Sequence, residues 1–132
     1  MINLKILKIA SDTKFMGLKD DYTHKTSAKN KSCGDKIKIE VIVKNKKIKL
    51  IRYETDSCVF CQASASLLAN YIKLLSVESF KKNYEILSKS QINDKKIPKK
   101  FQFINILVNK KNKSRHNCIM LPFNALSKAL NV

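Results

Sequence analysis

The sequence predicts an α+β domain in which helices cover one face of a small antiparallel β-sheet. Two short stretches of alternating apolar and polar residues lie close together in the first half of the chain, and segments with helical spacing follow them. The length of 132 residues is that of one domain. A chain of this size buries roughly two-thirds of its unfolded surface, so it needs no disulfide to fold. We therefore expect residues 1–132 to form a single domain.

The first half of the chain predicts the sheet. Residues 4–11 have the apolar spacing of a short amphipathic helix, and the mostly polar residues 12–34 predict a loop with a short extended piece near 22–29. Residues 36–43 and 47–54 alternate apolar, often β-branched residues with polar ones, and the three residues between them suit a tight turn. These two segments predict a two-stranded hairpin whose apolar face needs a helical layer over it.

The second half of the chain predicts that helical layer. Residues 62–75 begin with small residues and continue with large apolar residues at helical spacing. A second helix is expected over residues 77–87, with Ser76 as its N-cap. A Lys-rich connection over residues 88–100 follows, and residues 101–108 favour a helix, although a strand is also compatible with them.

The last predicted element is a helix that follows a basic loop at residues 109–115. We expect this helix to begin at about Cys118 or Met120 and to end at Leu130. Pro122 then fits only in its first turn, because proline has no backbone N–H to donate further along a helix.

The strong positive charge has two interpretations. The formal net charge is +17, and residues 88–132 contain ten basic residues and one acid, Asp94, which gives +9. Only two of the 27 basic residues are Arg, whereas surfaces that bind nucleic acid usually use more of it. We therefore ascribe most of the charge to a compositional bias toward Lys. If an acidic partner docks, we expect it on the C-terminal segment.

The expected location is the cytoplasm. Apolar runs are only a few residues long, so no transmembrane helix is predicted. Lys5 and Lys8 interrupt the apolar start, which argues against a secretory signal. In a reducing compartment, four Cys residues indicate metal binding or thiol chemistry more than disulfides.

A thiol and a carboxylate come together at the start of the first predicted strand. Cys33 and Asp35 are two residues apart, so in an extended chain both side chains point to one face. The hairpin returns Cys58 to the same end of the sheet, and Cys118 joins them if the last helix begins there. Three thiols and one carboxylate are four ligands, the tetrahedral number for zinc, and four ligands also hold a small Fe–S cluster. A nearby helix N-terminus would lower a thiol pKa.

The same residues leave other interpretations open. Any one of the thiols could simply be a small buried hydrophobe. Cys58 and Cys61 form a Cys-x-x-Cys pair, which is typical of redox-active thiols and of half a zinc site, but the chain has no second pair. His116 lies two residues before Cys118 and could be a ligand, whereas His24 lies in a polar segment and suits the surface.

These motifs resemble the U-type iron–sulfur scaffold proteins, the family of IscU, SufU and the NifU N-terminal domain. The resemblance rests on the Cys-Gly-Asp sequence at residues 33–35, on Cys58 followed by Ala-Ser-Ala-Ser at residues 63–66, and on the late Cys118. It covers nearly the whole chain. It implies that Cys33, Asp35, Cys58 and Cys118 bind iron or a transient [2Fe–2S] cluster. It also implies two kinds of partner, a cysteine desulfurase that supplies sulfur and apo-proteins that receive the cluster.

Within that family the closer likeness is to the SufU branch. Arg115 lies three residues before Cys118, as in that branch, and residues 76–114 are long enough to contain its insertion. Asn117 departs from both branches, which have His or Lys at that position. Cys61 also departs from both branches, and it could be a second sulfur-relay thiol, an alternative ligand or a buried residue in the first turn of the helix. The SufU branch is associated with a tightly bound Zn²⁺, so the alternative function is a zinc-dependent sulfurtransferase that relays sulfur and holds no cluster.

We expect each site residue to have its own role. Cys118 is the expected sulfur acceptor, because it lies beside a basic segment and near a helix N-terminus. Arg115 could steer the desulfurase or stabilise a persulfide anion. Asp35 binds a soft metal less firmly than a thiolate does, which makes the site exchangeable.

Two rival functions come from other classes. A basic nucleic-acid-binding module with a structural zinc is supported by the net charge, but the scarcity of Arg and the lack of a binding motif oppose it. A thiol oxidoreductase would use Cys58 and Cys61. The sequence leaves open whether the chain is an enzyme or mainly a carrier, and a homo-oligomer that binds a cluster between subunits is compatible with it.

Overall fold

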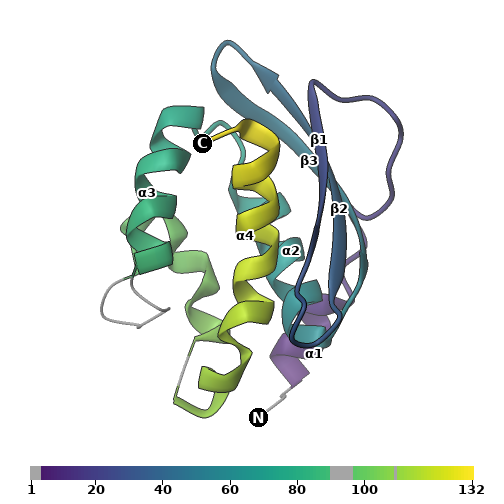
Figure 1. Cartoon of the computed structure of the whole chain (residues 1–132), viewed down its shortest axis with the longest axis vertical. Coiled ribbons are helices and arrows are strands. Elements are labelled where there is room, and N and C mark those ends of the chain that lie inside the picture. The colour runs from purple at the N-terminus through teal and green to yellow at the C-terminus, as the bar shows by residue number, and fades with distance from the viewer. Residues whose placement is uncertain (1–3, 90–96, 109) are drawn as a thin grey trace.

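The computed structural model describes residues 4–89, 97–108 and 110–132. After one short N-terminal helix, the three strands follow one another along the chain, and the remaining helices come after them (Figure 1). The elements in chain order are α1 (Leu4–Ala10), β1 (His24–Lys29), β2 (Lys36–Lys44), β3 (Lys47–Asp56), α2 (Val59–Tyr71), α3 (Val77–Lys89), the 3₁₀ helices η2 (Lys99–Leu107) and η3 (Lys110–Arg115), and α4 (His116–Leu130). The predicted α+β class is confirmed.

The sheet has three antiparallel strands in the order β1-β2-β3. The predicted hairpin is β2 and β3, and its turn places Asn45 and Lys46 at φ of 53° and 63°, the positive values that a tight two-residue hairpin turn requires. The extended piece expected near residues 22–29 is a full strand, which pairs with β2 from His24 opposite Val41 to Lys29 opposite Lys36. The sheet therefore has one strand more than the two that were predicted.

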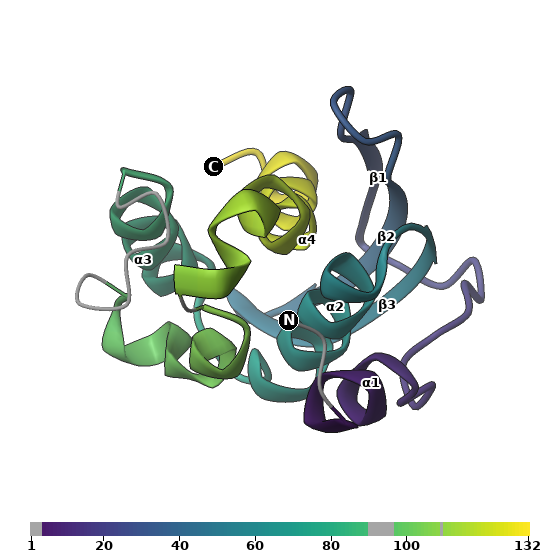
Figure 2. The same cartoon turned by 90° about the horizontal axis from the view of Figure 1, so that it is seen from below.

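One face of the sheet carries the core, and helices cover it. Helix α4 packs on β1 and β2, and α2 packs on β3, so the two helices lie side by side over the sheet (Figures 1 and 2). Helix α1 packs against α2, while α3 packs against α4. The alternation of the strands supplies the apolar floor beneath them. Its fully buried members are Ile37, Ile39, Val41, Ile48, Ile51 and Tyr53.

Several boundaries differ from the predictions. Helix α2 begins at Val59, three residues earlier than expected, and ends at Tyr71. It ends there because residues 74–75 pair with the start of β3 through two backbone hydrogen bonds of 2.8 Å to Ile48. Ser76 is the N-cap of α3, since its Oγ accepts the Ser79 N–H at 3.0 Å. Residues 99–107 and 110–115 are 3₁₀ helices, so the strand alternative for residues 101–108 and the expected loop at 109–115 were wrong over the described residues.

The position of Pro122 was also predicted wrongly. Helix α4 begins at His116, so Pro122 is its seventh residue and lies in the second turn. Because proline has no N–H, the carbonyl of Cys118, four residues earlier, has no helical donor. The ring is buried, and its packing offsets part of that cost.

Over the described ranges, the helices are all too short or too polar to cross a bilayer.

Candidate metal centre

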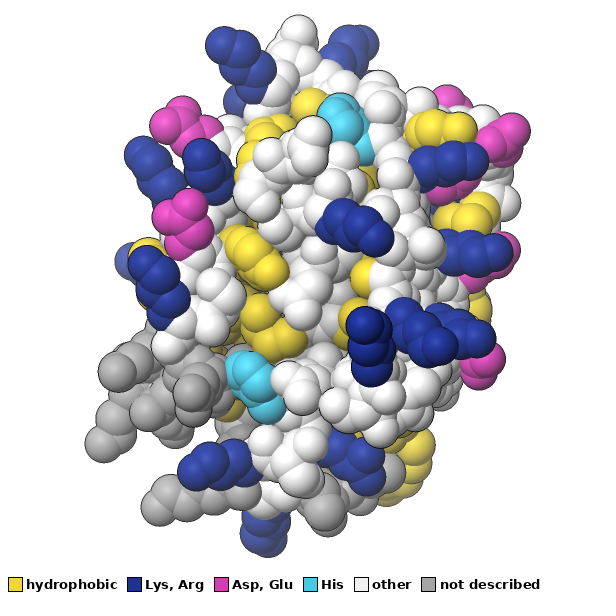
Figure 3. Space-filling view, viewed as in Figure 1, with side chains coloured by type: hydrophobic (Ala, Val, Ile, Leu, Met, Phe, Trp, Pro, Cys, Tyr) yellow, Lys and Arg dark blue, Asp and Glu magenta, His cyan; other side chains and the backbone are white. Residues whose placement is uncertain are grey.

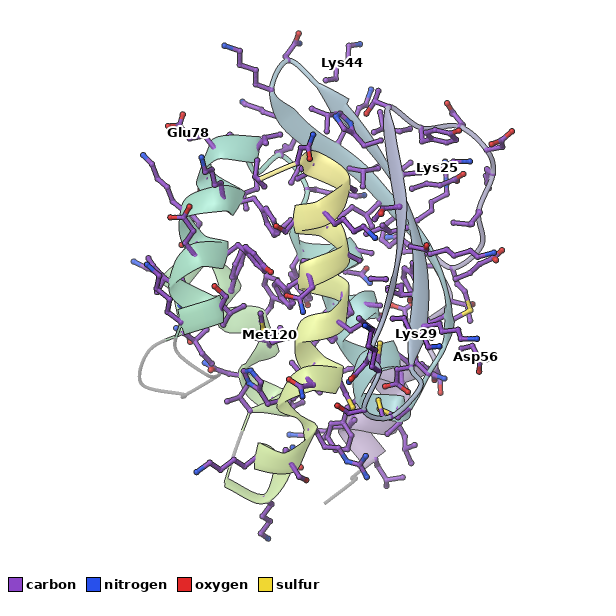
Figure 4. The ribbon with its side chains drawn as sticks, viewed as in Figure 1. Lys25, Lys29, Lys44, Asp56, Glu78 and Met120 are labelled. Atoms are coloured by element: carbon purple, nitrogen blue, oxygen red, sulfur yellow. The ribbon has the colours of Figure 1, made fainter. Side chains whose placement is uncertain are left out.

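The predicted ligands meet at one end of the sheet, where three segments converge. Cys33 lies in the loop between β1 and β2, Asp35 immediately precedes β2, Cys58 is the N-cap of α2, and Cys118 is the third residue of α4. Figure 4 marks this end of the sheet by Lys29 and Asp56, which end their strands there. Elements far apart in the sequence therefore bring the side chains together.

The β1–β2 loop is closed by its own backbone. The Asn30 N–H donates to the Asp35 carbonyl and the Gly34 N–H donates to the Asn30 carbonyl, each at 2.8 Å. Gly34 has a φ of 78°, a conformation that glycine adopts at little cost and that other residues adopt rarely. This turn holds Cys33 and Asp35 at the edge of the group.

Three of the four predicted ligands are close enough to share one ion. One ligand atom each from Cys33, Asp35 and Cys118 lies within 4.8 Å of the others, and the Sγ atoms of Cys33 and Cys118 are 3.9 Å apart. Cys58 is outside this set of three. Its thiol nevertheless interacts electrostatically with that of Cys118, and its backbone N–H donates to Asp35 Oδ1 at 3.1 Å.

The carboxylate of Asp35 is only half satisfied by the protein. Asp35 is 6% exposed, and while Oδ1 accepts the Cys58 N–H, the buried Oδ2 has no hydrogen-bond partner. A buried carboxylate oxygen without a partner is costly, unless a cation satisfies it. Thiolates with one carboxylate suit zinc and iron. The residues at this end therefore fit a bound metal.

The thiols differ in access and in acidity. Cys33 is exposed, Cys58 is half-buried, and Cys118 is 4% exposed. Burial raises the pKa of the Cys118 thiol, and its neighbours Cys58, Asp35 and Cys33 act in the same direction. At Cys118 the expected lowering of the thiol pKa by the helix N-terminus is therefore not found, because burial raises the pKa. A bound cation would reverse the balance by stabilising the thiolates.

Cys61 is buried in the first turn of α2, as one of the predicted alternatives had it. It is fully inaccessible, and burial raises its pKa to about 12, while a hydrogen bond with the Ser57 side chain opposes that shift. The thiol also interacts electrostatically with Asp35, Cys58 and Cys33. Cys61 therefore lies against the ligand group without belonging to the set that could hold a metal.

Arg115 links the starts of the two helices. It is the N-cap of α4, and its guanidinium lies 5.7 Å from the ring centroid of Phe60, in the first turn of α2. Its Nε is buried and has no hydrogen-bond partner among the described residues. No pattern in the sequence indicates the contact with Phe60, because the two residues meet only through the packing of α2 on α4.

The two histidines lie outside the set of possible metal ligands found in the described part of the chain. His116 is the first residue of α4 and is half-buried. His24 begins β1 opposite Val41, at the far end of the sheet from Lys29, and its Nδ1 hydrogen-bonds with the Thr23 hydroxyl at 2.9 Å. It is half-buried, whereas a surface position was expected.

Known proteins are similar to this chain in sequence and in fold. The model of the family described as "NifU-like N terminal domain" matches residues 2–131. The chain is 32% identical over 131 residues to the protein named "Iron-sulfur cluster assembly scaffold protein IscU" of Thermotoga maritima, which covers 98% of this chain and 92% of that protein.

Solved structures agree in architecture. The N-terminal part of a NifU-like protein from Brucella abortus superposes with a TM-score of 0.80 at 16% identity, covering 98% of this chain and 91% of that one. A putative scaffold protein of the SUF system from Fervidobacterium islandicum gives 0.74 at 22% identity, covering 98% and 96%. These likenesses support the fold and, at such identities, no more than the fold.

Proposed function

This chain belongs to the family of NifU-like N-terminal domains, and from that premise we propose that it is an iron–sulfur cluster assembly scaffold. The observation that carries the proposal is the group of Cys33, Asp35 and Cys118, whose ligand atoms lie within 4.8 Å of one another around an unpartnered carboxylate oxygen. Iron and sulfur are the substrates of such a site. The assembled cluster is its cargo.

The four candidate ligand residues have different roles in binding the cluster. Cys33, Asp35 and Cys118 form the group that could take the first metal ion, and Cys58 lies against it. Asp35 is the weakest ligand for a soft metal, because a carboxylate is harder than a thiolate. A site with one weak ligand releases its cargo more readily, as a scaffold must.

Sulfur reaches the site as a persulfide on a cysteine desulfurase. The Cys118 thiolate attacks the outer sulfur, a new S–S bond forms on Cys118, and the desulfurase thiolate leaves. Cys118 is 4% exposed, so the docked partner has to displace residues that bury it. One of these residues is the exposed Cys33, whose Sγ lies 3.9 Å from that of Cys118. Arg115, the N-cap of α4 three residues before Cys118, is the positive charge that we assign to the resulting persulfide anion.

The surface around Cys118 favours an acidic partner. Helix η3, which leads directly into α4, has the sequence Lys-Lys-Asn-Lys-Ser-Arg and contains no acidic residue. Among the described residues, the lower end of the face in Figure 3 shows dark-blue basic side chains and no magenta acidic ones. A desulfurase and apo-protein acceptors with acidic docking surfaces would be steered to this end. A reducing cytoplasm is the compartment that keeps these thiols available.

A second candidate is the zinc-dependent sulfurtransferase of SufU type. Arg115 favours it, because the residue stands three before Cys118 and its buried Nε has no partner among the described residues. In this alternative Zn²⁺ occupies the same ligands, keeps the thiols deprotonated until docking, and the protein relays sulfur without holding a cluster.

The deciding experiment measures metal and acid-labile sulfide in protein purified without oxygen, in wild type and in Cys118→Ser. Stoichiometric iron with sulfide in wild type, lost in the variant, is the expected result. One zinc per chain without sulfide would favour the sulfurtransferase, and desulfurase stimulation would then be measured. No metal in either protein would refute the ligand group.

A second variant tests the role of the carboxylate. If Asp35 makes the site exchangeable, Asp35→Ala keeps a reconstituted cluster longer than wild type does. Transfer of the cluster to an apo-ferredoxin, followed by visible absorbance, measures that lifetime. Loss of the cluster at the wild-type rate would contradict the role given to Asp35.

A further inference from the structure

Two thiols lie at the start of α2 with the Cys-x-x-Cys spacing that is typical of redox-active pairs. Cys58 is the N-cap, with extended backbone angles of −70° and 166°, and Cys61 is the third helical residue. An N-cap side chain characteristically folds back over the second and third residues of its helix. Its usual hydrogen bond to the backbone is absent here, so the Cys58 thiol is not committed to capping.

The interactions of Cys61 show that its side chain faces the ligand group. Its thiol interacts with Cys58, Cys33 and Asp35 and hydrogen-bonds with the Ser57 side chain. It is fully buried, so reagents in solution do not reach it. Cys58 in turn is half-buried and interacts electrostatically with Cys118. Cys58 therefore lies between Cys61, in its own helix, and the ligand group that contains Cys118.

Persulfide sulfur cannot enter a cluster as it arrives. Its outer sulfur is at the level of elemental sulfur, whereas the bridging atoms of a cluster are sulfide, so each sulfur needs two electrons. A thiol that attacks the inner sulfur of a persulfide supplies both of them and forms a disulfide. Cys61 has no other assigned role.

We propose that Cys61 is the resolving thiol that converts a persulfide on Cys58 into sulfide at the assembly site. This inference rests on the proposed function, since a desulfurase has to supply the persulfide. It adds an internal reductant to that function, so the scaffold releases sulfide where iron is held.

The steps balance in atoms and electrons. The Cys58 thiolate attacks the outer sulfur of the Cys118 persulfide, and the Cys118 thiolate leaves. Cys61 then attacks Cys58 Sγ, the Cys58–Cys61 disulfide forms, and the outer sulfur leaves with the thiol proton as hydrogen sulfide. The two thiols are oxidised by two electrons and the transferred sulfur is reduced by two. A cellular dithiol reductant restores the pair by thiol–disulfide exchange.

The structure suits this chemistry in two further ways. The positive end of the α2 dipole lies at Cys58 and stabilises the anion that leaves there. Cys58 is also outside the group of Cys33, Asp35 and Cys118 that could hold the first metal ion, so its oxidation leaves that group intact.

The test follows sulfide release without added reductant. Metal-free wild type and Cys61→Ser are loaded anaerobically with inorganic polysulfide, desalted, and followed by sulfide assay and intact mass. Wild type is expected to release one sulfide for each persulfide loaded and to lose two hydrogens. Cys61→Ser should retain its persulfide and release sulfide at least about tenfold more slowly, because an adjacent thiol reacts far faster than an intermolecular one.

Controls separate this chemistry from folding and from the proposed function. Ala65→Ser introduces a hydroxyl into the same buried helix and should release sulfide as wild type does. Chymotryptic cleavage after Phe60 separates the two cysteines, so linked peptides identify a Cys58–Cys61 disulfide in wild type itself.

Two results would overturn the inference while the proposed function stands. These are sulfide release from Cys61→Ser at the wild-type rate, and an oxidised product in which Cys33 is linked to Cys118. A parallel loading with a cysteine desulfurase and cysteine tests the function separately. If neither protein gains the mass of a sulfur atom from the desulfurase, the proposed function fails and the inference fails with it.

Discussion

The two ends of α4 are built on opposite principles. At the C-terminal end, Asn131 takes a left-handed conformation, the Val132 N–H donates to the Ser127 carbonyl at 3.1 Å, and the Ser127 hydroxyl donates to the Val132 carbonyl at 2.6 Å. At the N-terminal end no side chain caps the helix, and Pro122 removes the hydrogen bond to the Cys118 carbonyl.

The same contrast holds for the side chains around the helix. Phe123 is fully buried, with its ring centroid 5.2 Å from that of Phe101 and 6.2 Å from that of Phe103. Around Cys118, by contrast, Asp35 Oδ2 and Arg115 Nε are buried without partners among the described residues. The aromatic packing around Phe123 stabilises the fold. The N-terminal end of α4, by contrast, lies among buried polar groups that have no partner within the described protein.

The largest expected effect comes from disrupting the aromatic packing in the middle of α4, where Phe123 lies. Phe123→Ala removes a fully buried ring from the aromatic cluster and should lower the free energy of unfolding by about 3–5 kcal/mol. Urea denaturation followed by circular dichroism measures the change. The metal content of the protein that remains folded should equal that of wild type, and loss of metal from the folded fraction would show that the two ends are not separate.

A substitution in the ligand group is expected to raise the free energy of unfolding. Asp35→Asn removes the unpartnered buried charge but keeps an oxygen for the Cys58 N–H. We expect the metal-free protein to gain about 1–2 kcal/mol in the free energy of unfolding, because an uncompensated buried charge is destabilising. Thermal unfolding with a chelator present checks this. A variant less stable than wild type would mean that the carboxylate stabilises the fold by itself.

The buried thiol predicts a loss of stability in alkali. Burial raises the pKa of Cys61 from 9.0 to about 12, so between these values the unfolded chain loses a proton that the folded chain keeps. Stability therefore falls as pH rises through this window, by up to about 1.4 kcal/mol per pH unit for this group. Cys61→Ala should show a shallower decline than wild type in urea titrations at a series of pH values. Equal slopes would contradict the assignment.

The smallest effect is expected from Pro122. Pro122→Ala restores an N–H to the Cys118 carbonyl, and we expect a gain of about 1 kcal/mol after the greater entropy of the unfolded variant is subtracted. Hydrogen exchange at the amide of residue 122 should show protection in the variant. A loss of stability would indicate that ring packing outweighs the missing hydrogen bond.

Much of this molecule follows from local sequence. Alternation in β2 and β3 places Ile37 and Ile39 on the core face, and the Ser76 cap begins α3 as predicted. The Cys-Gly-Asp turn before a strand predicted the family correctly, and the family membership is confirmed. These features depend on residues only a few positions apart, so a pattern in the sequence is enough to reveal them.

Other features depend on how distant segments pack. The pKa of the Cys118 thiol is raised where a lowering by the helix N-terminus was expected, because Cys118 is buried when α4 packs on β1 and β2. The same packing allows Pro122 inside the helix and brings Arg115 over Phe60. The sequence by itself identified the candidate ligand residues. Only the tertiary structure decided which of them are buried, which are left without partners, and which three could share one ion, because burial and hydrogen bonding are properties of the packed chain.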